Sequence, residues 1–266
     1  MSSQQTILFL GATGGVTNAC LSLALKSRSY RCIALVRTPQ KLTDQLKTQQ
    51  KLDDALLANL TILQGNALDQ AAVKSAILAH GSLPNMIMSG LGGAPSMTFN
   101  IRHPLQFVQI DQPNICENAA KTLVSALQAI YNEEPSLTSS KPAIIFVSTT
   151  GISRGAEDVP FGLRTLYHGM LAQAHEDKKG MESVFRNSGD VFSAVTGIRP
   201  TLLAGAGTVD GSEGKGVAAV KAGTEREPHM GFLIQRADVG AWVYENVVEG
   251  KDSGRWRGEM CSLAYA

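Results

Sequence analysis

Short, continuously apolar runs recur along this chain and alternate with segments of helical periodicity. Runs of this kind are typical of parallel strands that are buried on both faces of a sheet. Because each parallel strand needs a crossover to the next, the alternation predicts a doubly wound α/β fold. We therefore expect a parallel sheet of about seven strands with helices on both faces. The expected strands are Thr6–Leu10, Arg31–Val36, Leu60–Leu63, Met86–Met88, Ala143–Val147, Phe192–Ile198 and Glu259–Leu263. The expected helices include Asn18–Ser27, Ala71–Ala79 and Asn114–Tyr131.

Nothing in the sequence divides the chain into separate parts. Its 266 residues contain no internal repeat and no low-complexity linker, and they suffice for one large hydrophobic core. We expect a single domain over residues 1–266, with Asp111 capping the helix that starts near Asn114. Two long loop segments, at about 92–112 and in a small C-terminal region at about 204–236, are expected to cover a substrate.

The composition excludes several classes of partner. The formal net charge is +1, and no run of lysine and arginine provides the footprint of nucleic-acid or anionic-membrane binding. No apolar run reaches the ~18 residues of a membrane span, and the N-terminus lacks a secretory pattern, so we expect a cytoplasmic protein. No His, Cys and Asp group has metal-ligand spacing, and no metal site is expected. The cysteines form no CxxC pair and are expected to be reduced and packed: Cys20, Cys32, Cys116 and Cys261.

A glycine-rich stretch, "GATGGV", lies between the first expected strand and the first expected helix. Gly11 permits a tight turn there, and Gly14 allows the backbone to approach a pyrophosphate at the helix N-terminus. The position after the first strand of a strand–helix–strand unit therefore predicts dinucleotide binding. Thr17 stands where the third glycine of the usual spacing falls, so we expect the helix to sit slightly farther from the sheet. Gly15 is expected to relieve part of that crowding.

The end of the second expected strand predicts which dinucleotide binds. An acidic residue at this place usually binds the free 2′-hydroxyl of NAD(H). Here Arg37 ends the strand, and Thr38 and Lys41 follow it. A planar guanidinium suits a 2′-phosphate and also stacks on adenine, so NADP(H) is favoured over NAD(H). The alternative is that Arg37 is an ordinary solvated surface residue.

Together these residues resemble the short-chain dehydrogenase/reductase superfamily, specifically its atypical, NmrA-like branch of NAD(P)-binding proteins. The resemblance covers nearly the whole chain and includes the motifs "GATGGV", "LQGNALD", "MSGLGG", "FVSTTG", "DKKGME", "GIRPTLL" and "RADVGAWV". It implies a Rossmann-like fold. It also implies that the adenine is contacted by Asn66, where the family commonly has Asp, and that Pro200 packs beside the nicotinamide. The cofactor-binding residues predicted from pattern and resemblance together are Gly11, Thr13, Gly14, Gly15, Val16, Arg37, Thr38, Lys41, Asn66, Ala67, Ser89, Gly90, Leu91, Ser148, Lys178 and Pro200.

The resemblance breaks at the proton donor. Reductases of the superfamily use Tyr-x-x-x-Lys on one helix, with the lysine holding the ribose hydroxyls. Lys178 and Glu182 fit the related Lys-x-x-x-Glu pattern, but Ala174 stands where the tyrosine belongs. His175 shares roughly the helix face of Lys178, and an imidazole with a reference pKa near 6.5 can donate a proton at neutral pH. Alternatively, His175 only makes a structural hydrogen bond, and Tyr167 is a less favoured phenol.

Hydroxyl groups at the end of the fifth expected strand complete the predicted site. Ser148 and Thr150 project to one side of the sheet because side chains alternate along a strand. We expect Thr150 to orient the reacting oxygen and Ser148 to face the cofactor; otherwise they satisfy strand-end backbone groups. An apolar group either lines a substrate pocket or packs the two long loops onto the sheet. Its members are Met97, Phe99, His103, Phe107, Met230 and Phe232.

The sequence thus predicts an NADPH-dependent reductase of a small, largely apolar carbonyl or enone-like substrate, with Lys178, Thr150 and His175 in the catalytic roles. The cofactor supplies the redox chemistry, and the protein supplies orientation. Because the tyrosine position is lost, a non-catalytic NADP-binding regulator with a protein partner is the main alternative. A non-redox isomerase on the same fold is a further one.

Overall fold

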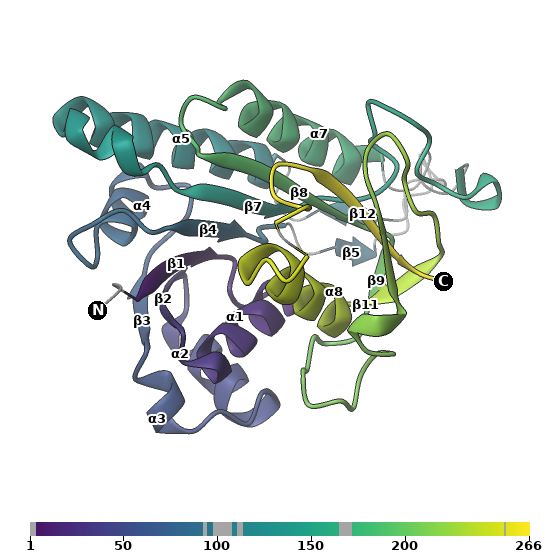
Figure 1. Cartoon of the computed structure of the whole chain (residues 1–266), viewed down its shortest axis with the longest axis horizontal. Coiled ribbons are helices and arrows are strands. Elements are labelled where there is room, and N and C mark those ends of the chain that lie inside the picture. The colour runs from purple at the N-terminus through teal and green to yellow at the C-terminus, as the bar shows by residue number, and fades with distance from the viewer. Residues whose placement is uncertain (1–3, 93–94, 98–107, 111–113, 165–171, 253) are drawn as a thin grey trace.

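One mixed sheet of eight strands runs through the computed structural model, which describes residues 4–92, 95–97, 108–110, 114–164, 172–252 and 254–266 (Figure 1). The strands are β1 (Gln5–Leu10), β2 (Tyr30–Val36), β3 (Leu60–Gln64), β4 (Met86–Ser89), β7 (Ala143–Val147), β8 (Ala194–Pro200), β10 (Val220–Gly223) and β12 (Met260–Tyr265). Their order is β10-β12-β8-β7-β4-β1-β2-β3, and all pairs are parallel except β10 with β12. The predicted doubly wound α/β fold is confirmed, with one strand more than expected.

The missed strand, β10, lies at the edge of the sheet and lacks a continuous apolar run. Its burial alternates from Val220 to exposed Lys221, so its sequence carried no signal of a strand covered on both faces. The seven predicted strands are all present within two residues of their expected bounds. The largest shift is at β8, where the strand begins at Ala194 rather than Phe192 and continues to Pro200.

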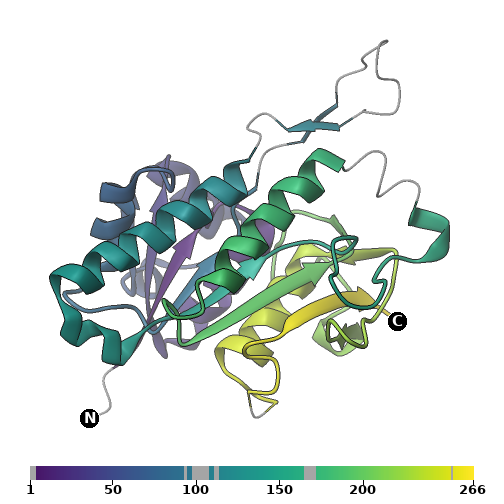
Figure 2. The same ribbon diagram turned by 90° about the horizontal axis from the view of Figure 1, so that it is seen from above.

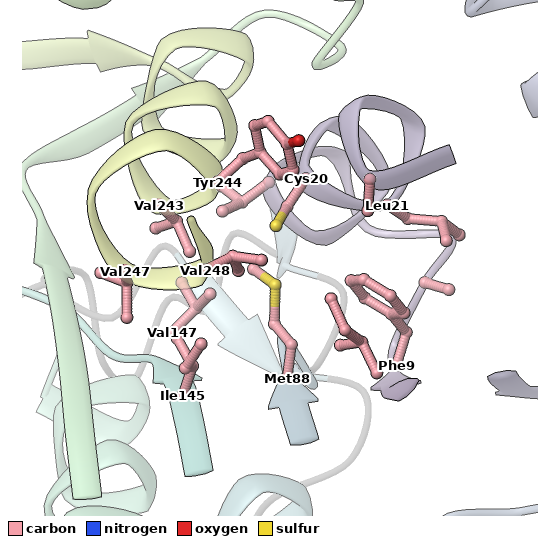
Figure 3. Packing of buried hydrophobic residues seen from close by; sticks show 14 of the residues in the cluster. Phe9, Cys20, Leu21, Met88, Ile145, Val147, Val243, Tyr244, Val247 and Val248 are labelled. Carbon is pink, nitrogen blue, oxygen red and sulfur yellow. The ribbon is translucent and has the colours of Figure 1, made fainter. Parts of the chain in front are cut away.

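Helices cover both faces of the sheet. The helices α1 (Gly15–Ser27) and α8 (Arg236–Val243) lie on one face, below the sheet in Figure 1. On the other face lie α4 (Gln70–Ile77), α5 (Ile115–Glu133) and α7 (Ala172–Asn187). Strand β1 shows why its sequence is apolar throughout, since Ile7 and Phe9 pack into one core and Leu8 and Leu10 into the other. Figure 3 shows the first of these cores around Phe9, Met88 and Val248.

Smaller elements surround this three-layer body. Helix α2 (Pro39–Asp44), a π-helical turn (Gln45–Gln49) and α3 (Asp54–Leu57) connect β2 to β3, and the 3-10 turns are Pro135–Ser140, Phe161–Leu163 and Val217–Ala219. Tyr244–Val248 extends α8 as a second π-helical turn. Two short strand pairs belong to the loop segments: antiparallel β5 (Pro95–Met97) with β6 (Val108–Ile110), in the first predicted covering segment, and parallel β9 (Leu202–Ala204) with β11 (Leu233–Gln235), at the two ends of the second. Seen from above in Figure 2, β5 and β6 project beyond the sheet.

The start of α5 is capped from another helix. The carboxylate of Asp177, on α7, accepts hydrogen bonds from the amides of Cys116 (3.1 Å) and Glu117 (2.9 Å). Asn114 is the residue before the helix, and its side chain makes no capping bond. The predicted cap, Asp111, lies outside the described residues. Because Asp177 is next to Lys178 in the chain, this cap also fixes α7 against α5 at the level of the candidate site.

Candidate functional site

The glycine-rich loop turns directly from β1 into α1. Gly11 has φ +76°, and the amide of Gly14 donates to its carbonyl over 2.9 Å. A side chain at Gly11 would meet the backbone of Gly90 at 2.9 Å, so this approach requires glycine. Helix α1 begins at Gly15, three residues before the predicted start at Asn18, because the extended Gly14 already serves as N-cap. The first-turn amides of α1 therefore point toward the loop, and α1 has no acidic residue in its first turn.

Close packing of α1 on the sheet is achieved without the third glycine. A side chain at Gly90, just after β4, would overlap the Thr17 hydroxyl group, so glycine on the strand side makes room for threonine on the helix side. Gly15 instead makes room for another segment, since a side chain there would collide with the carbonyl of Ala206 and with Arg236. The expected crowding is thus relieved at Gly90 rather than at Gly15.

A buried amide network, which the sequence analysis missed, braces this loop. Asn18 donates through Nδ2 to the carbonyl of Ala12 over 3.0 Å. Gln50, only 1% exposed, donates through Nε2 to Asn18 Oδ1 and to the carbonyl of Gly207, both over 2.8 Å. Its Oε1 accepts from the amide of Val209 over 3.0 Å. Through Gln50, the network fixes the glycine-rich loop to the segment 207–209, which starts 157 residues beyond Gln50 in the chain.

A cleft of about 570 Å³ opens beside the loop, at the carboxyl ends of β1 to β4. It lies where the strand order reverses between β1 and β4, the usual ligand site of an open parallel sheet. The predicted residues that line it are Gly11, Thr13, Gly14, Arg37, Thr38, Lys41, Asn66, Ala67, Gly90 and Leu91. The lining residues that the sequence analysis did not name are Leu35, Val36, Gly65, Leu68, Gly92, Ile115 and Ala119. Predicted residues outside this lining are Gly15, Val16, Ser89, Ser148, Lys178 and Pro200.

The charge of the cleft is positive. Arg37 and Lys41 are exposed, and neither forms an ion pair with a carboxylate in the part of the chain that the structure describes. Among the described residues of the lining, none is an aspartate or a glutamate. Asn66 uses its Oδ1 to accept from the amide of Leu68 over 3.1 Å, which leaves its amide nitrogen for another partner. An anionic ligand would therefore meet two cations that no described carboxylate neutralises.

Lys178 joins the ends of two strands. Its ammonium group donates to the carbonyl of Leu91, after β4, over 2.9 Å and to the carbonyl of Val147, the last residue of β7, over 2.8 Å. An ammonium has three donors, and the thiol of Cys116 also lies beside this group. Since Leu91 also lines the cleft, Lys178 supports its wall from behind.

The hydroxyl groups after β7 have different surroundings. Ser148 is buried and donates to Glu182 Oε1 over 2.6 Å. Thr150 is fully buried, its amide donates to the carbonyl of Pro200 over 3.2 Å, and its Oγ1 has no partner among the described residues. Thr149, which the sequence analysis did not name, is half-buried.

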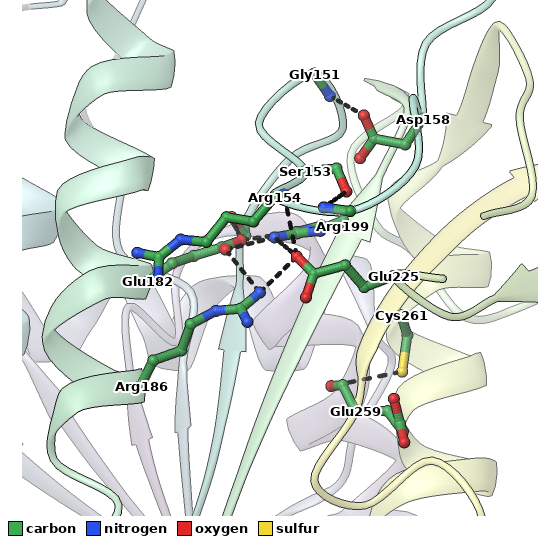
Figure 4. Close-up of polar contacts among 12 residues, drawn as sticks. Gly151, Ser153, Arg154, Asp158, Glu182, Arg186, Arg199, Glu225, Glu259 and Cys261 are labelled. Atoms are coloured by element: carbon green, nitrogen blue, oxygen red, sulfur yellow. Dashed lines mark hydrogen bonds and ion pairs between the residues drawn. The ribbon is translucent and has the colours of Figure 1, made fainter. Parts of the chain in front are cut away.

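Glu182 belongs to a buried ion network rather than to the cleft. Its carboxylate binds the Arg199 guanidinium through two bonds of 2.9 and 2.6 Å, and both residues are at most 2% exposed (Figure 4). A buried, bidentate pair of this kind fixes both side chains. It connects α7, which carries Lys178, to β8.

The remaining candidates are placed as follows. His175 is buried on α7, one turn before Lys179, and Ala174 is half-buried beside it. Met230 and Phe232 are 45% and 64% exposed, so neither is a core residue. Tyr167, Phe99, His103 and Phe107 lie outside the described residues, as does the side chain of Met97.

The four cysteines are all buried and unpaired. Burial raises the pKa of the Cys32 and Cys261 thiols to about 12 and that of Cys116 to about 11. Within the described ranges, no three His, Cys, Asp or Glu side chains are grouped as metal ligands. In the same ranges, no helix has both the length and the apolar character needed to cross a membrane.

The fold and its glycine-lined cleft define a Rossmann-like nucleotide-binding protein. Residues 11–249 match the family described as NAD(P)H-binding, and the chain belongs to that family. Oxidase pynE of Aspergillus niger is 39% identical, over 98% of this chain and 99% of its own length. Reductase pytE of Aspergillus terreus is 34% identical, over 99% of both chains. A short-chain dehydrogenase/reductase of Veillonella parvula, solved in complex with NADP, has a TM-score of 0.65 at 14% identity, covering 98% of this chain and 94% of that one. The predicted membership of an NAD(P)-binding family is confirmed, and the predicted Rossmann-like fold is shared with the short-chain dehydrogenase/reductase structure.

Proposed function

We propose that the protein is an NADPH-dependent reductase of a small, largely apolar carbonyl or enone. The observation that carries this proposal is the cleft at the ends of β1 to β4, where a glycine turn faces two unneutralised cations. The close approach at Gly11 suits a pyrophosphate, and Arg37 with Lys41 suits a 2′-phosphate. Membership of the NAD(P)H-binding family and relatives named oxidase and reductase support the oxidoreductase class.

In this proposal NADPH, when bound, supplies a hydride, and the chain's own residues hold and orient the reactants. The glycine-rich loop and Asn66 hold the adenosine and pyrophosphate part. Lys178, with one donor not engaged by Leu91 or Val147, holds a ribose hydroxyl. The buried Thr150 hydroxyl is an acceptor and donor without a partner among the described residues, and a substrate oxygen would satisfy it. His175, buried on the same helix as Lys178, is the proposed proton donor.

One observation favours a second function. Ala174 occupies the tyrosine position on α7, and its methyl group has no proton to give. A protein that binds NADP(H) without turnover, and signals its redox state to a protein partner, would tolerate this loss.

The test combines binding with turnover. Purified protein is titrated with NADPH and with NADH by fluorescence, and NADPH oxidation is then followed with a panel of ketones, enones and quinones. Saturable NADPH binding at least tenfold tighter than NADH binding, with turnover of some member of the panel, supports the reductase. Tight binding with no turnover favours the regulator, and absence of saturable NADPH binding contradicts both.

A further inference from the structure

Four charged side chains form a network between α7, β8 and the segment after β10. Arg199 binds Glu182 on α7 and also binds Glu225, over 2.9 Å. Arg186, one turn after Glu182, binds Glu225 over 2.7 Å. Glu225 therefore receives two guanidinium groups from two different elements, the helix α7 and the strand β8 (Figure 4). Glu182 meets the same two groups, but it lies on α7 itself, whereas Glu225 comes from the segment after β10. The side chain of Glu225 is 20% exposed, whereas Glu182 and Arg199 are almost completely buried.

Glu225 also holds the loop that follows β7. The amide of Arg154 donates to its Oε1 over 3.3 Å, and the amide of Ala156 donates to its main-chain carbonyl over 3.2 Å. Gly155 lies so close that a side chain there would collide with the same carbonyl. At the end of this loop, Asp158 accepts from the amide of Gly151 over 2.8 Å and closes it. The segment from Gly151 to Asp158 is thus fixed at its neck by Asp158 and at its tip by Glu225.

The position of this loop relates it to the reacting end of the site. It follows the carboxyl end of β7, directly after Thr150, on the side of the sheet away from the adenosine-binding strands β2 and β3. In an open parallel sheet a dinucleotide spans the point where the strand order reverses, so its second half faces β7 and β8. Ile152, Ser153 and Arg154 also line a hollow of about 610 Å³ with residues of α7.

The two arginines keep the Glu225 carboxylate charged throughout the pH range in which proteins are usually folded. Partial burial acts to raise the pKa of this carboxyl, but the Arg186 hydrogen bond and the Arg199 charge outweigh it and lower the pKa to about 2. Three donors, from Arg186, Arg199 and the Arg154 amide, converge on the same oxygen, Oε1. Loss of that charge would leave two guanidinium groups facing each other around a neutral acceptor.

We propose that Glu225 is a positioning residue: it holds the Gly151–Asp158 loop against α7 and β8 as a wall of the substrate side, without touching the cofactor. The proposal rests on the proposed reductase function for its substrate part only. The attachment of the loop stands on the contacts of Glu225 alone. Its removal is expected to loosen the loop and weaken substrate binding while cofactor binding remains.

The first measurement reads the loop directly. Limited trypsin digestion, followed by mass spectrometry, gives the rate of cleavage after Arg154 in the native protein. In Glu225→Gln this rate is expected to rise at least tenfold, because the loop opens more often. Glu227→Gln is the matched control, since Glu227 is exposed on the same segment and has no side-chain ion pair among the described residues; its rate is expected to stay within twofold. Equal cleavage rates in wild type and Glu225→Gln overturn the proposal.

The second measurement uses the substrate found in the turnover screen. Glu225→Gln is expected to raise KM at least fivefold, with the Kd for NADPH within twofold of wild type. Glu225→Asp keeps the charge between the two arginines but falls short of the Arg154 amide, so it is expected to show the same rise in KM with a smaller loss of thermal stability. A loosened loop with unchanged KM overturns the substrate part of the proposal. If the wild type turns over nothing, the reductase function fails, while the trypsin result still decides the role of Glu225.

Discussion

Thr17 on α1 occupies the space that a side chain at Gly90 would need. The hydroxyl oxygen of Thr17 is buried and has no hydrogen-bond partner among the described residues, and it overlaps the place of a Gly90 methyl group. The usual dinucleotide fold puts a glycine on the helix at this contact. Here the larger residue, Thr17, is on the helix and the glycine, Gly90, is at the strand end, so the two elements still pack closely.

This exchange predicts a double-mutant rescue. Gly90→Ala is expected to lower the free energy of unfolding by about 1–3 kcal/mol through overpacking. Thr17→Ala removes an unpartnered hydroxyl and is expected to change stability by less than about 1 kcal/mol. In the double variant the two Cβ atoms would lie 3.1 Å apart, tight but without the hydroxyl overlap, so most of the loss is recovered. Urea denaturation of the four proteins measures the coupling, and additive effects would contradict the contact.

Arg37 predicts the cofactor preference. Removal of a charge-assisted hydrogen bond to a phosphate costs about 1.5–3 kcal/mol, so Arg37→Ala is expected to weaken NADPH binding roughly tenfold to a hundredfold. NADH has no 2′-phosphate, and its Kd is expected to change less than about threefold. The control is Lys47→Ala, because Lys47 is outside the cleft lining and pairs with Asp54. Equal losses for both dinucleotides would show that Arg37 does not contact the 2′-phosphate.

The sequence predicted the strands because burial on both faces leaves a continuous apolar run. Alternate residues of β1 enter different cores, so Ile7 and Leu8 both have to be apolar. Strand β10 was not predicted, because it is an edge strand with the exposed Lys221 within its four residues. Once the strands are predicted, the residues at their carboxyl ends are known as well. The sequence alone therefore placed Gly11 and Arg37 at the cleft.

The polar supports of the site were not predictable in the same way. Gln50 and Glu225 look like surface residues in the sequence, and only the fold brings Gln50 to Gly207 and Glu225 to Arg199. A polar residue shows no periodic pattern that reveals its burial, since its role depends on partners distant in the chain. The Lys-x-x-x-Glu pattern pointed to Glu182, but nothing in the sequence predicts that its carboxylate binds Ser148 and Arg199.

Lys178 is expected to affect both stability and cofactor binding. Lys178→Ala leaves the carbonyls of Leu91 and Val147 without their ammonium donor, at a cost of about 1–3 kcal/mol in unfolding free energy. The wall of the cleft at Leu91 then loses its support, so NADPH binding is expected to weaken at least tenfold. Lys179→Ala is the matched control, because Lys179 is exposed and its partner among the described residues is the exposed Glu176. Fluorescence titration and urea denaturation are the measurements, and equal results for the two variants would contradict this role.

Removing one partner of the buried Glu182–Arg199 pair is expected to cost much more stability than breaking an exposed ion pair. Glu182→Ala leaves the guanidinium of Arg199, which is 1% exposed, with Glu225 as its remaining carboxylate, and is expected to cost about 3–5 kcal/mol. Lys121→Ala breaks the exposed pair with Glu117 on α5 and is expected to cost less than about 0.5 kcal/mol. Thermal and urea unfolding compare the two. A loss below about 1 kcal/mol for Glu182→Ala would show that the network contributes little to stability.

Asp158 predicts a pH dependence of opposite sign to that of most carboxylates. Burial raises the pKa of its carboxyl, and the hydrogen bond from the Gly151 amide offsets this only in part. The folded state therefore binds a proton that the unfolded state has already released, and stability falls as the pH rises from about 4 through the folded pKa.

Asp158→Asn keeps an acceptor for Gly151 and removes the titration. Its free energy of unfolding relative to wild type is expected to increase from pH 4 to 7, by about 1.4 kcal/mol for each unit by which the folded pKa is raised. Glu134→Gln, at an exposed carboxylate after α5, serves as the control and is expected to show no such rise. A difference between Asp158→Asn and wild type that stays constant with pH would mean that the Asp158 carboxyl titrates alike in the folded and unfolded states.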